Sequence, residues 1–128
     1  MIEIWCQVKS NNDYEISNLG RLRSLKSKFY GRIIRPYYHS KGYVCVNLWN
    51  CGKQEKWKLH RLVAIHFIDN PCNLPEVNHK DCNKHNNVDT NLEWVSSQDN
   101  VVHAKRHNRY SKSFKKIPNE IIRVATAE

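Results

Sequence analysis

The chain has 128 residues, enough for one compact domain or two small ones, and 40% of them are hydrophobic. Lysine and arginine total 21 against 12 acidic residues, a net charge of +9 at pH 7. Such a charge on a small protein indicates a polyanionic partner, and its clustering favours nucleic acid over a basic protein without such a partner. No apolar run approaches the roughly 20 residues of a membrane span, and no secretory signal precedes the first strand, so we expect a cytoplasmic protein.

The five cysteines form no recognisable pattern. Their number is odd, and none belongs to a Cys-x-x-Cys pair. Because thiols stay reduced in the cytoplasm, we expect no disulfide framework. A zinc site from Cys72, Cys82 and His85 is an alternative, but its spacing matches no known finger or ribbon, and we favour scattered structural cysteines.

The first half of the chain predicts a small antiparallel sheet closed by a helix. The expected elements are strands near 14–16 and 22–25, an extended segment at 33–38, strands at 42–49 and 54–59, and a helix at 60–68. Aromatic and β-branched residues mark the strand at 42–49, and Pro71 ends the helix region. His60 begins this helix, where we expect a structural or phosphate contact, and His66 is expected to be structural.

Basic residues follow the first turn with no acid between Ile16 and Gln54. Arg21 and Arg23 alternate onto one strand face, which predicts a phosphate-tracking surface rather than a merely solvated one. A second acid-free basic run begins at Lys105. The residues that we expect to contact DNA are Arg21, Arg23, Lys26, Lys28, Arg32, Arg61, Lys80, Lys84, Lys105 and Arg106.

The stretch from 77 to 108 predicts strand, loop, strand and helix, with polar side chains on each. His79, Asn91 and Asn100 lie 12 and then 9 residues apart. A histidine beside oxygen ligands suits a hard metal ion and a water nucleophile. The alternative is a polar loop between two strands that uses Asn for its turns.

The run V-N-H-K-D-C-N-K-H-N-N-V-D-T-N-L-E-W-V resembles the HNH motif of phage-type and intron-encoded homing endonucleases. Earlier runs, Y-E-I-S-N-L-G-R-L-R-S-L, G-Y-V-C-V-N-L and H-R-L-V-A-I-H-F-I-D-N-P, are similar to the modular DNA-binding segment that often precedes it. The resemblance covers roughly residues 4–108. It implies an α+β fold with a β-rich DNA-binding segment and closing helix at 1–70, a ββα-metal nuclease motif at 71–110, and a basic tail with a short helix at 111–128.

The resemblance implies a metal-dependent DNA endonuclease that leaves a 5′-phosphate and a 3′-hydroxyl and nicks one strand per active site. His79 would be the general base, and Asn91 would hold the loop and orient His79. Asn78 and Asn100 would ligate one divalent cation, Mg²⁺ first and Mn²⁺ as the alternative. Asp81 and His103 would be auxiliary groups. The expected substrate is double-stranded DNA, and the expected oligomeric state is a monomer. The protein would act in the cytoplasm of a bacterial host, and its gene would be carried by the host or by a phage.

Two positions depart from the family pattern. Asn78 stands where many members carry an Asp ligand, and a neutral amide binds a hard cation more weakly than a carboxylate does. Cys82 stands where Gly is usual, in a turn that favours positive φ. These departures support a second hypothesis, a DNA-binding protein with a weakened or inactive HNH motif, and RNA as the substrate is a third. A His79 sealed beneath packed side chains would count against hydrolysis.

Overall fold

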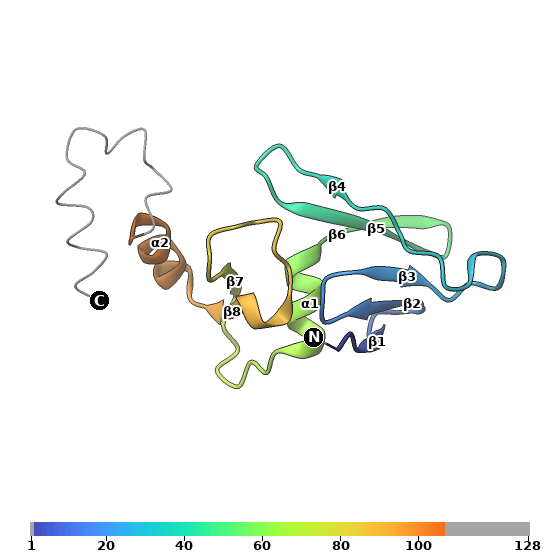
Figure 1. The fold of residues 1–128 in the computed structure, drawn as a ribbon, viewed down its shortest axis with the longest axis horizontal. Helices are drawn as coiled ribbons and strands as arrows, with labels where there is room; N and C mark the ends of the chain where they lie inside the picture. The colour runs from blue at the N-terminus through green and yellow to red at the C-terminus, as the bar shows by residue number, and fades with distance from the viewer. Residues whose placement is uncertain (1, 107–128) are drawn as a thin grey trace.

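The computed structural model describes residues 2–106, with side chains as far as His103. The described chain forms three small antiparallel sheets and two helices (Figure 1). In chain order the elements are β1 (Trp5–Val8), β2 (Asn11–Ser17), β3 (Leu22–Ser24), the 3₁₀ turn η1 (Ser27–Phe29), β4 (Tyr37–Tyr38), β5 (Val44–Asn50), β6 (Lys53–Lys58), α1 (Leu59–Phe67), β7 (Glu76–His79), the 3₁₀ turn η2 (Asp89–Asn91), β8 (Leu92–Val95) and α2 (Ser97–Arg106). The tail expected at 111–128 lies outside the described residues.

The prediction of a single N-terminal sheet was wrong. β1, β2 and β3 form one three-stranded sheet, and β4, β5 and β6 form another. The segment between β3 and β4 turns through η1 and is joined to the first sheet by backbone bonds at Gly31, Arg32 and Ile34 and by a bridge between Arg23 and Ile33. Pro36 then offers no N–H to a neighbouring strand, which is consistent with a β4 of only two residues.

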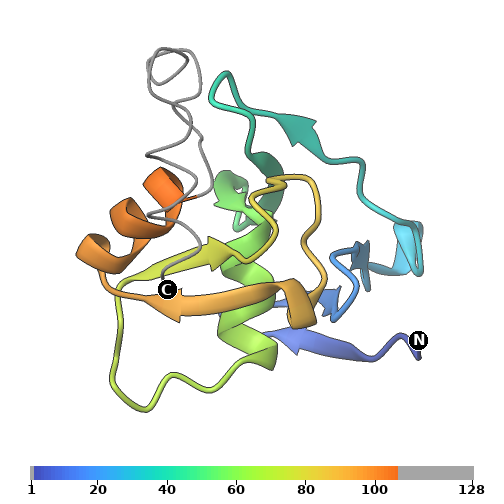
Figure 2. The ribbon, with the colours of Figure 1, turned by 60° about the vertical axis from the view of Figure 1, so that its left-hand side comes forward.

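Helix α1 was predicted at 60–68, and this is confirmed at Leu59–Phe67. It lies between the N-terminal sheets and the β7–β8 hairpin, and α2 packs on the same hairpin (Figure 2). The α1 residues Leu62, Val63 and Ala64 are fully buried. Neither helix of the described part is long and apolar enough to cross a membrane.

One hydrophobic core serves both halves of the described chain. Its buried members are Val8, Tyr14, Ile16, Leu22, Val44, Val46, Leu48, Leu59, Leu62, Val63, Ala64, Val77 and Leu92. Because Val77 and Leu92 come from the hairpin and the others from the first 70 residues, the hairpin is held by the N-terminal half through apolar burial. His66 adds a polar link: its Nε2 accepts the backbone N–H of Lys9 at 2.9 Å, the structural role that was expected.

Candidate functional site

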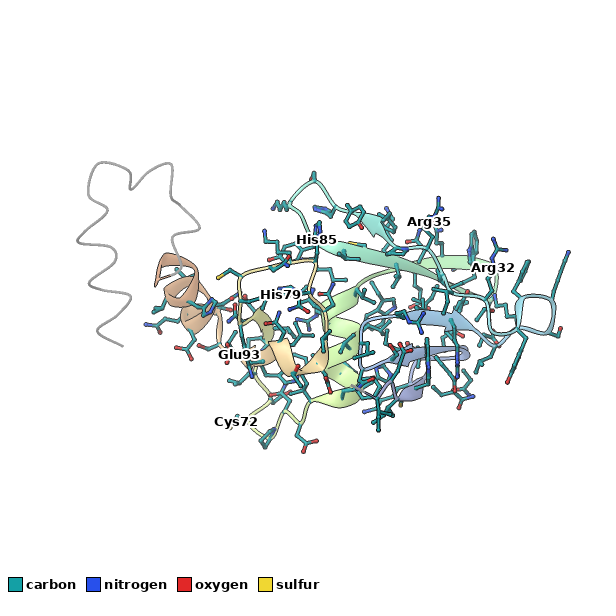
Figure 3. The ribbon with its side chains drawn as sticks, viewed as in Figure 1. Arg32, Arg35, Cys72, His79, His85 and Glu93 are labelled. Atoms are coloured by element: carbon teal, nitrogen blue, oxygen red, sulfur yellow. The ribbon has the colours of Figure 1, made fainter. Side chains whose placement is uncertain are left out.

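Strand β7 presents its side chains to two faces, as any strand does. Glu76 and Asn78 face α2, where Asn100 contacts Glu76. Val77 and His79 face α1, where His60 lies against the His79 ring. The strand–loop–strand–helix order predicted for this region is confirmed by β7, β8 and α2. Figure 3 marks the position of His79 in this hairpin.

His79 is held in place by burial, by a hydrogen bond and by two neighbouring rings. Only 3% of the residue is exposed, and its Nε2 lies 2.8 Å from Asn87 Oδ1. Because a carboxamide oxygen can only accept, Nε2 carries the hydrogen and the lone pair is on Nδ1. The rings of His60 and Tyr43 lie 4.8 and 6.3 Å from it, centroid to centroid. The structure therefore fixes one tautomer of a packed imidazole.

His60 contributes a neutral ring beside His79. It is 5% exposed and stacks on Tyr43 at 5.1 Å. Burial lowers the pKa of His60 to about 3, with further contributions from His79 and nearby cations. Among the side chains that the structure places, none hydrogen-bonds the buried Nδ1 of His60. An unpaired buried nitrogen is costly, which makes this ring an unusual choice for a simple packing position.

Two lysines flank the same ring cluster. Lys58 Nζ lies 4.7 Å and Lys84 Nζ 4.5 Å from the centre of the Tyr43 ring. Lys84 also donates to the carbonyl of Lys41 at 2.7 Å. The α1 side of β7 is thus cationic, as a phosphate-binding surface requires.

The opposite face carries the two candidate metal-binding amides, each held by a carboxylate. Asn78 Nδ2 donates to Glu93 Oε2 at 2.8 Å, and Asn100 Nδ2 donates to Glu76 Oε1 at 2.7 Å. Glu93 lies directly opposite Asn78 in the β7–β8 register. Hydrogen bonds from Ser97 and then Asn100 lower the pKa of Glu76, which is therefore anionic at neutral pH.

The chemistry of this donor set fits a hard cation. Amide and carboxylate oxygens are the ligands that Mg²⁺ and Mn²⁺ prefer. Within residues 2–103 no group of three His, Cys, Asp or Glu side chains gathers to hold a metal, so the alternative zinc site is not assembled there and any site on this face needs the amides. The two glutamates place negative charge beside the amides of Asn78 and Asn100.

Asp81 organises the loop between the strands. Its Oδ1 accepts from Asn83 N at 2.8 Å and from Asn91 Nδ2 at 2.9 Å, and its Oδ2 accepts from Asn86 Nδ2 at 2.9 Å. These bonds, that from Asn86 first, lower its pKa. Asn91 also donates to the carbonyl of Asn86, so it holds the loop, as proposed for the middle Asn of the motif.

The expectation that Asn91 orients His79 was wrong: Asn91 bonds to Asp81 and Asn86, and the hydrogen bond of His79 Nε2 is made with Asn87, a residue that was not predicted from the sequence. Asn87 is supported by the N-terminal half: a Cβ at Gly20 would lie 3.0 Å from its carbonyl oxygen. Gly20 has φ of +84°, in the left-handed region, and Asp89 N donates to Asn18 O at 2.8 Å beside it. The turn at 18–20 therefore lies directly behind the partner of His79.

Cys82 and His103 join the loop to α2. Cys82 has φ of 62°, which confirms the expected positive-φ turn. Its Sγ lies 3.8 Å from His103 Nδ1, and His103 Nε2 donates to the carbonyl of Lys80 at 3.2 Å. The thiol contact gives a physical reason for a side chain where a glycine would suit the backbone better.

Four of the expected DNA contacts are engaged within the protein, among them Lys84 through its bond to the Lys41 carbonyl. Arg21 pairs with Glu3, and Arg23 with Glu15 at 2.7 Å. Arg61 donates to the carbonyl of Pro75 at 2.9 Å. The run without acids was misleading for Arg21 and Arg23, because their partners come from neighbouring strands and the N-terminal segment.

The other expected contacts differ in surroundings. Lys26 lies 5.4 Å from the Tyr14 ring, and Lys28 and Arg32 lie 5.8 and 5.7 Å from the Phe29 ring. Lys80 is exposed at the start of the loop. The side chains of Lys105 and Arg106 lie outside the described residues.

The comparisons with known proteins match both halves of this arrangement. The NUMOD4 motif matches residues 3–49. Uncharacterized HNH endonuclease L245 of Acanthamoeba polyphaga mimivirus is 40% identical over 104 residues, which are 81% of this chain and 30% of that protein. DNA endonuclease I-HmuI of Bacillus phage SP01 is 39% identical over 98 residues, 76% of this chain and 55% of that protein. The chain thus spans about half or less of the length of these relatives.

A solved structure of an HNH homing endonuclease has a similar fold. It is described as DNA binding and cleavage by the HNH homing endonuclease I-HmuI, and it superposes with a TM-score of 0.72 at 34% identity. The match covers 91% of this chain and 68% of that one. It therefore extends across the N-terminal sheets, α1 and the β7–β8–α2 unit together.

Proposed function

Because the chain belongs to the HNH homing endonuclease family, we propose that it is a divalent-metal-dependent endonuclease that nicks double-stranded DNA. The solved relative is described as binding and cleaving DNA, and two relatives are phage proteins. We propose that the chain acts as a monomer on DNA in a bacterial cytoplasm.

The observation that carries the proposal is the division of β7 into two chemically different faces. His79 lies on the face with Lys58 and Lys84, and Asn78 lies on the face with Glu76 and Glu93. A scissile phosphate is attracted to the first face and a cation to the second. A phosphodiester at the end of this strand would contact both.

In the proposed reaction, His79 Nδ1 accepts a proton from the water that attacks phosphorus. Asn87 accepts from the opposite ring nitrogen, so that in the neutral ring the lone pair is on Nδ1. Asn78 and Asn100 would hold the cation, which when bound stabilises the charge on the phosphate and the leaving oxygen. The water oxygen bonds to phosphorus as the bond from phosphorus to the 3′ oxygen breaks, and the leaving oxygen takes up a proton from solvent, which leaves a 5′-phosphate and a 3′-hydroxyl.

Because His79 is buried, DNA binding must be accompanied by a movement that exposes it. With 3% of His79 and 2% of Asn78 exposed, a phosphate reaches them only if the neighbouring loop shifts. We assign this movement to the loop 80–91, whose tip is largely exposed. The same burial favours a second candidate function, a DNA-binding protein in which the HNH motif does not cut.

A plasmid assay separates the two candidates. Supercoiled DNA is incubated with the full chain and Mg²⁺ or Mn²⁺, beside His79→Ala and the matched control His85→Ala, an exposed histidine of the same loop. Metal-dependent relaxation by the wild type and His85→Ala, lost in His79→Ala, supports the nuclease. A gel shift without relaxation supports the binding protein. Resealing of the nick by ligase checks the 5′-phosphate, and an RNA competitor checks the nucleic acid.

A further inference from the structure

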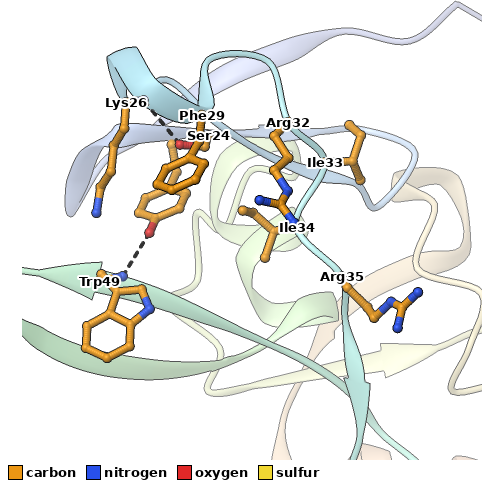
Figure 4. Close-up of a pocket in the computed structure, with 9 residues that line it drawn as sticks. Ser24, Lys26, Phe29, Arg32, Ile33, Ile34, Arg35 and Trp49 are labelled. Atoms are coloured by element: carbon orange, nitrogen blue, oxygen red, sulfur yellow. Dashed lines mark hydrogen bonds between the residues drawn. The ribbon is translucent and has the colours of Figure 1, made fainter.

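A cavity of about 730 Å³ opens between the N-terminal sheet and β5 (Figure 4). Its size falls in the range of about 300–1,000 Å³ that small-molecule sites occupy. Figure 3 shows Arg32, one of its residues, displaced from His79 along the longest axis of the molecule. The cavity is therefore separate from the catalytic face of β7.

The walls of the cavity are held by hydrogen bonds. On one side, the backbone N–H of Trp49 donates to the Tyr14 hydroxyl at 3.0 Å, and Asn11 Nδ2 donates to the Trp49 carbonyl at 2.9 Å. On the other side, Ser24 N donates to Arg32 O at 2.9 Å. The cavity is thus formed before any ligand arrives, which reduces the cost of binding.

Its lining combines aromatic faces with positive charge. Trp49 is 48% exposed and Phe29 is 42% exposed, although both are large and apolar. Lys26, Arg32 and Arg35 supply the cations. None of the lining residues, all within the described chain, is acidic. A ligand with one flat apolar surface and one negative group satisfies both parts of the lining.

A nucleotide has this chemistry, and the shape of the cavity determines whether that nucleotide can be paired or must be unpaired. Aromatic rings bind the π-face of a base, and cations track the phosphate, in proteins that bind single strands. In a paired duplex each base face is covered by its neighbours in the stack. The aromatic rings lie in a hollow, where the convex duplex backbone meets only the rim. An unpaired nucleotide fits where a base pair does not.

We propose that this cavity binds one unpaired nucleotide of the DNA substrate, with its base on Trp49 and Phe29 and its phosphate at Arg32 and Arg35. The inference rests on the proposed function, because bent or nicked DNA supplies nucleotides that have left the stack. The cavity would hold such a nucleotide while the HNH face engages the backbone elsewhere. It would add a preference for distorted DNA to the charge-based binding of the duplex.

The test compares two duplexes that differ by one extrahelical 2-aminopurine. Binding of the full chain is measured in EDTA by anisotropy, and the stacking of the probe by its fluorescence. We expect the wild type to bind the bulged duplex about 5- to 150-fold more tightly, the range given by stacking one base. Trp49→Ala should remove this preference and the quenching of the probe, with little effect on the paired duplex.

Matched variants keep the test interpretable. Tyr30→Ala removes an aromatic ring that is 75% exposed in the adjoining turn but outside the cavity lining, and it should keep the preference. Trp49→Phe should restore most of it. An absent preference in the wild type, its persistence in a folded Trp49→Ala, or displacement of the bulged duplex by free deoxynucleotide at equal concentration overturns the proposal.

The two proposals fail separately. Nicking of paired plasmid in Mg²⁺ without a bulge preference would leave the nuclease and remove the nucleotide site. A bulge preference that depends on Trp49, without nicking, would leave the nucleotide site and remove the nuclease. A ribonucleotide bulge bound more tightly than the deoxyribonucleotide one would also overturn the assignment to DNA.

Discussion

Replacing Glu93 by Gln should weaken divalent-metal binding without unfolding the protein. Glu93 accepts a hydrogen bond of 2.8 Å from Asn78, the amide in the place of the family's Asp. The substitution keeps the size of the side chain and removes its charge. It therefore tests whether the carboxylate compensates for the neutral ligand.

The expected loss of metal affinity follows from the change of this hydrogen bond from a charged to a neutral acceptor. A bond to a charged group contributes about 1.5–3 kcal/mol and a neutral one about 0.5–1.5 kcal/mol, a difference of roughly 1–2 kcal/mol. If this difference keeps the amide oxygen turned to the cation, affinity falls about 5- to 30-fold. That range overlaps the roughly 10- to 100-fold measured for outer-shell partners of metal ligands.

The assay is Mn²⁺ binding to the full chain by electron paramagnetic resonance, with plasmid nicking against Mg²⁺ concentration as a second readout. The matched control is Glu55→Gln, in which a Glu that accepts from Asn50 at 3.2 Å loses its charge on the β5–β6 hairpin. Unchanged Mn²⁺ affinity in Glu93→Gln, or an equal loss in Glu55→Gln, would refute the argument.

Four other substitutions, two of them with a matched control, give separate tests. Gly20→Ala and Gly52→Ala both force a Cβ onto positive φ, which costs about 1–2 kcal/mol, but only the former meets Asn87, so only it should also slow nicking. His60→Phe removes an unpaired nitrogen and should stabilise the fold by about 1 kcal/mol in urea titrations at pH 7. Because the pKa of His60 is depressed to about 3, the unfolded state takes up a proton below about pH 6.5 that the folded state does not, so the fold loses stability as pH falls from about 6.5 towards 3, and the variant should show a shallower loss there. Cys82→Gly should raise the melting temperature less than Cys51→Gly, because only Cys82 gives up a thiol contact. Glu3→Gln should lower the urea midpoint at pH 6 and match the wild type as pH falls towards 2, because the hydrogen bond from Arg21 lowers the pKa of Glu3 from 4.5 to about 2.

Local patterns were sufficient to predict most of the elements. The β5–β6 hairpin follows from alternating aromatic and β-branched residues around a turn at Cys51 and Gly52, and α1 follows from an apolar cluster ended before Pro71. The division into two N-terminal sheets could not be predicted in this way. It depends on which strands pair, and strand pairing is a non-local property.

The ion pairs of the N-terminal half also depend on non-local contacts that the sequence pattern does not reveal. A short sequence window displays Arg21 and Arg23 without their partners Glu3 and Glu15, because the partners are separated by 18 and 8 residues. The spacing of His79, Asn91 and Asn100 placed the motif on its strands and helix. It could not show that Glu76 and Glu93 hold the amides, since that depends on the register of β7 against β8.

The two halves of the chain meet at the proposed site. A DNA-binding segment that only delivered substrate would need no contact with the general base. Here the turn at Gly20 supports Asn87, Asn87 fixes the tautomer of His79, and His60 of α1 packs against its ring. An isolated 71–110 segment would lose all three constraints together with the core that it shares through Val77 and Leu92. The N-terminal half is therefore part of the proposed site, and its substitution should affect the rate of cleavage as well as the affinity for DNA.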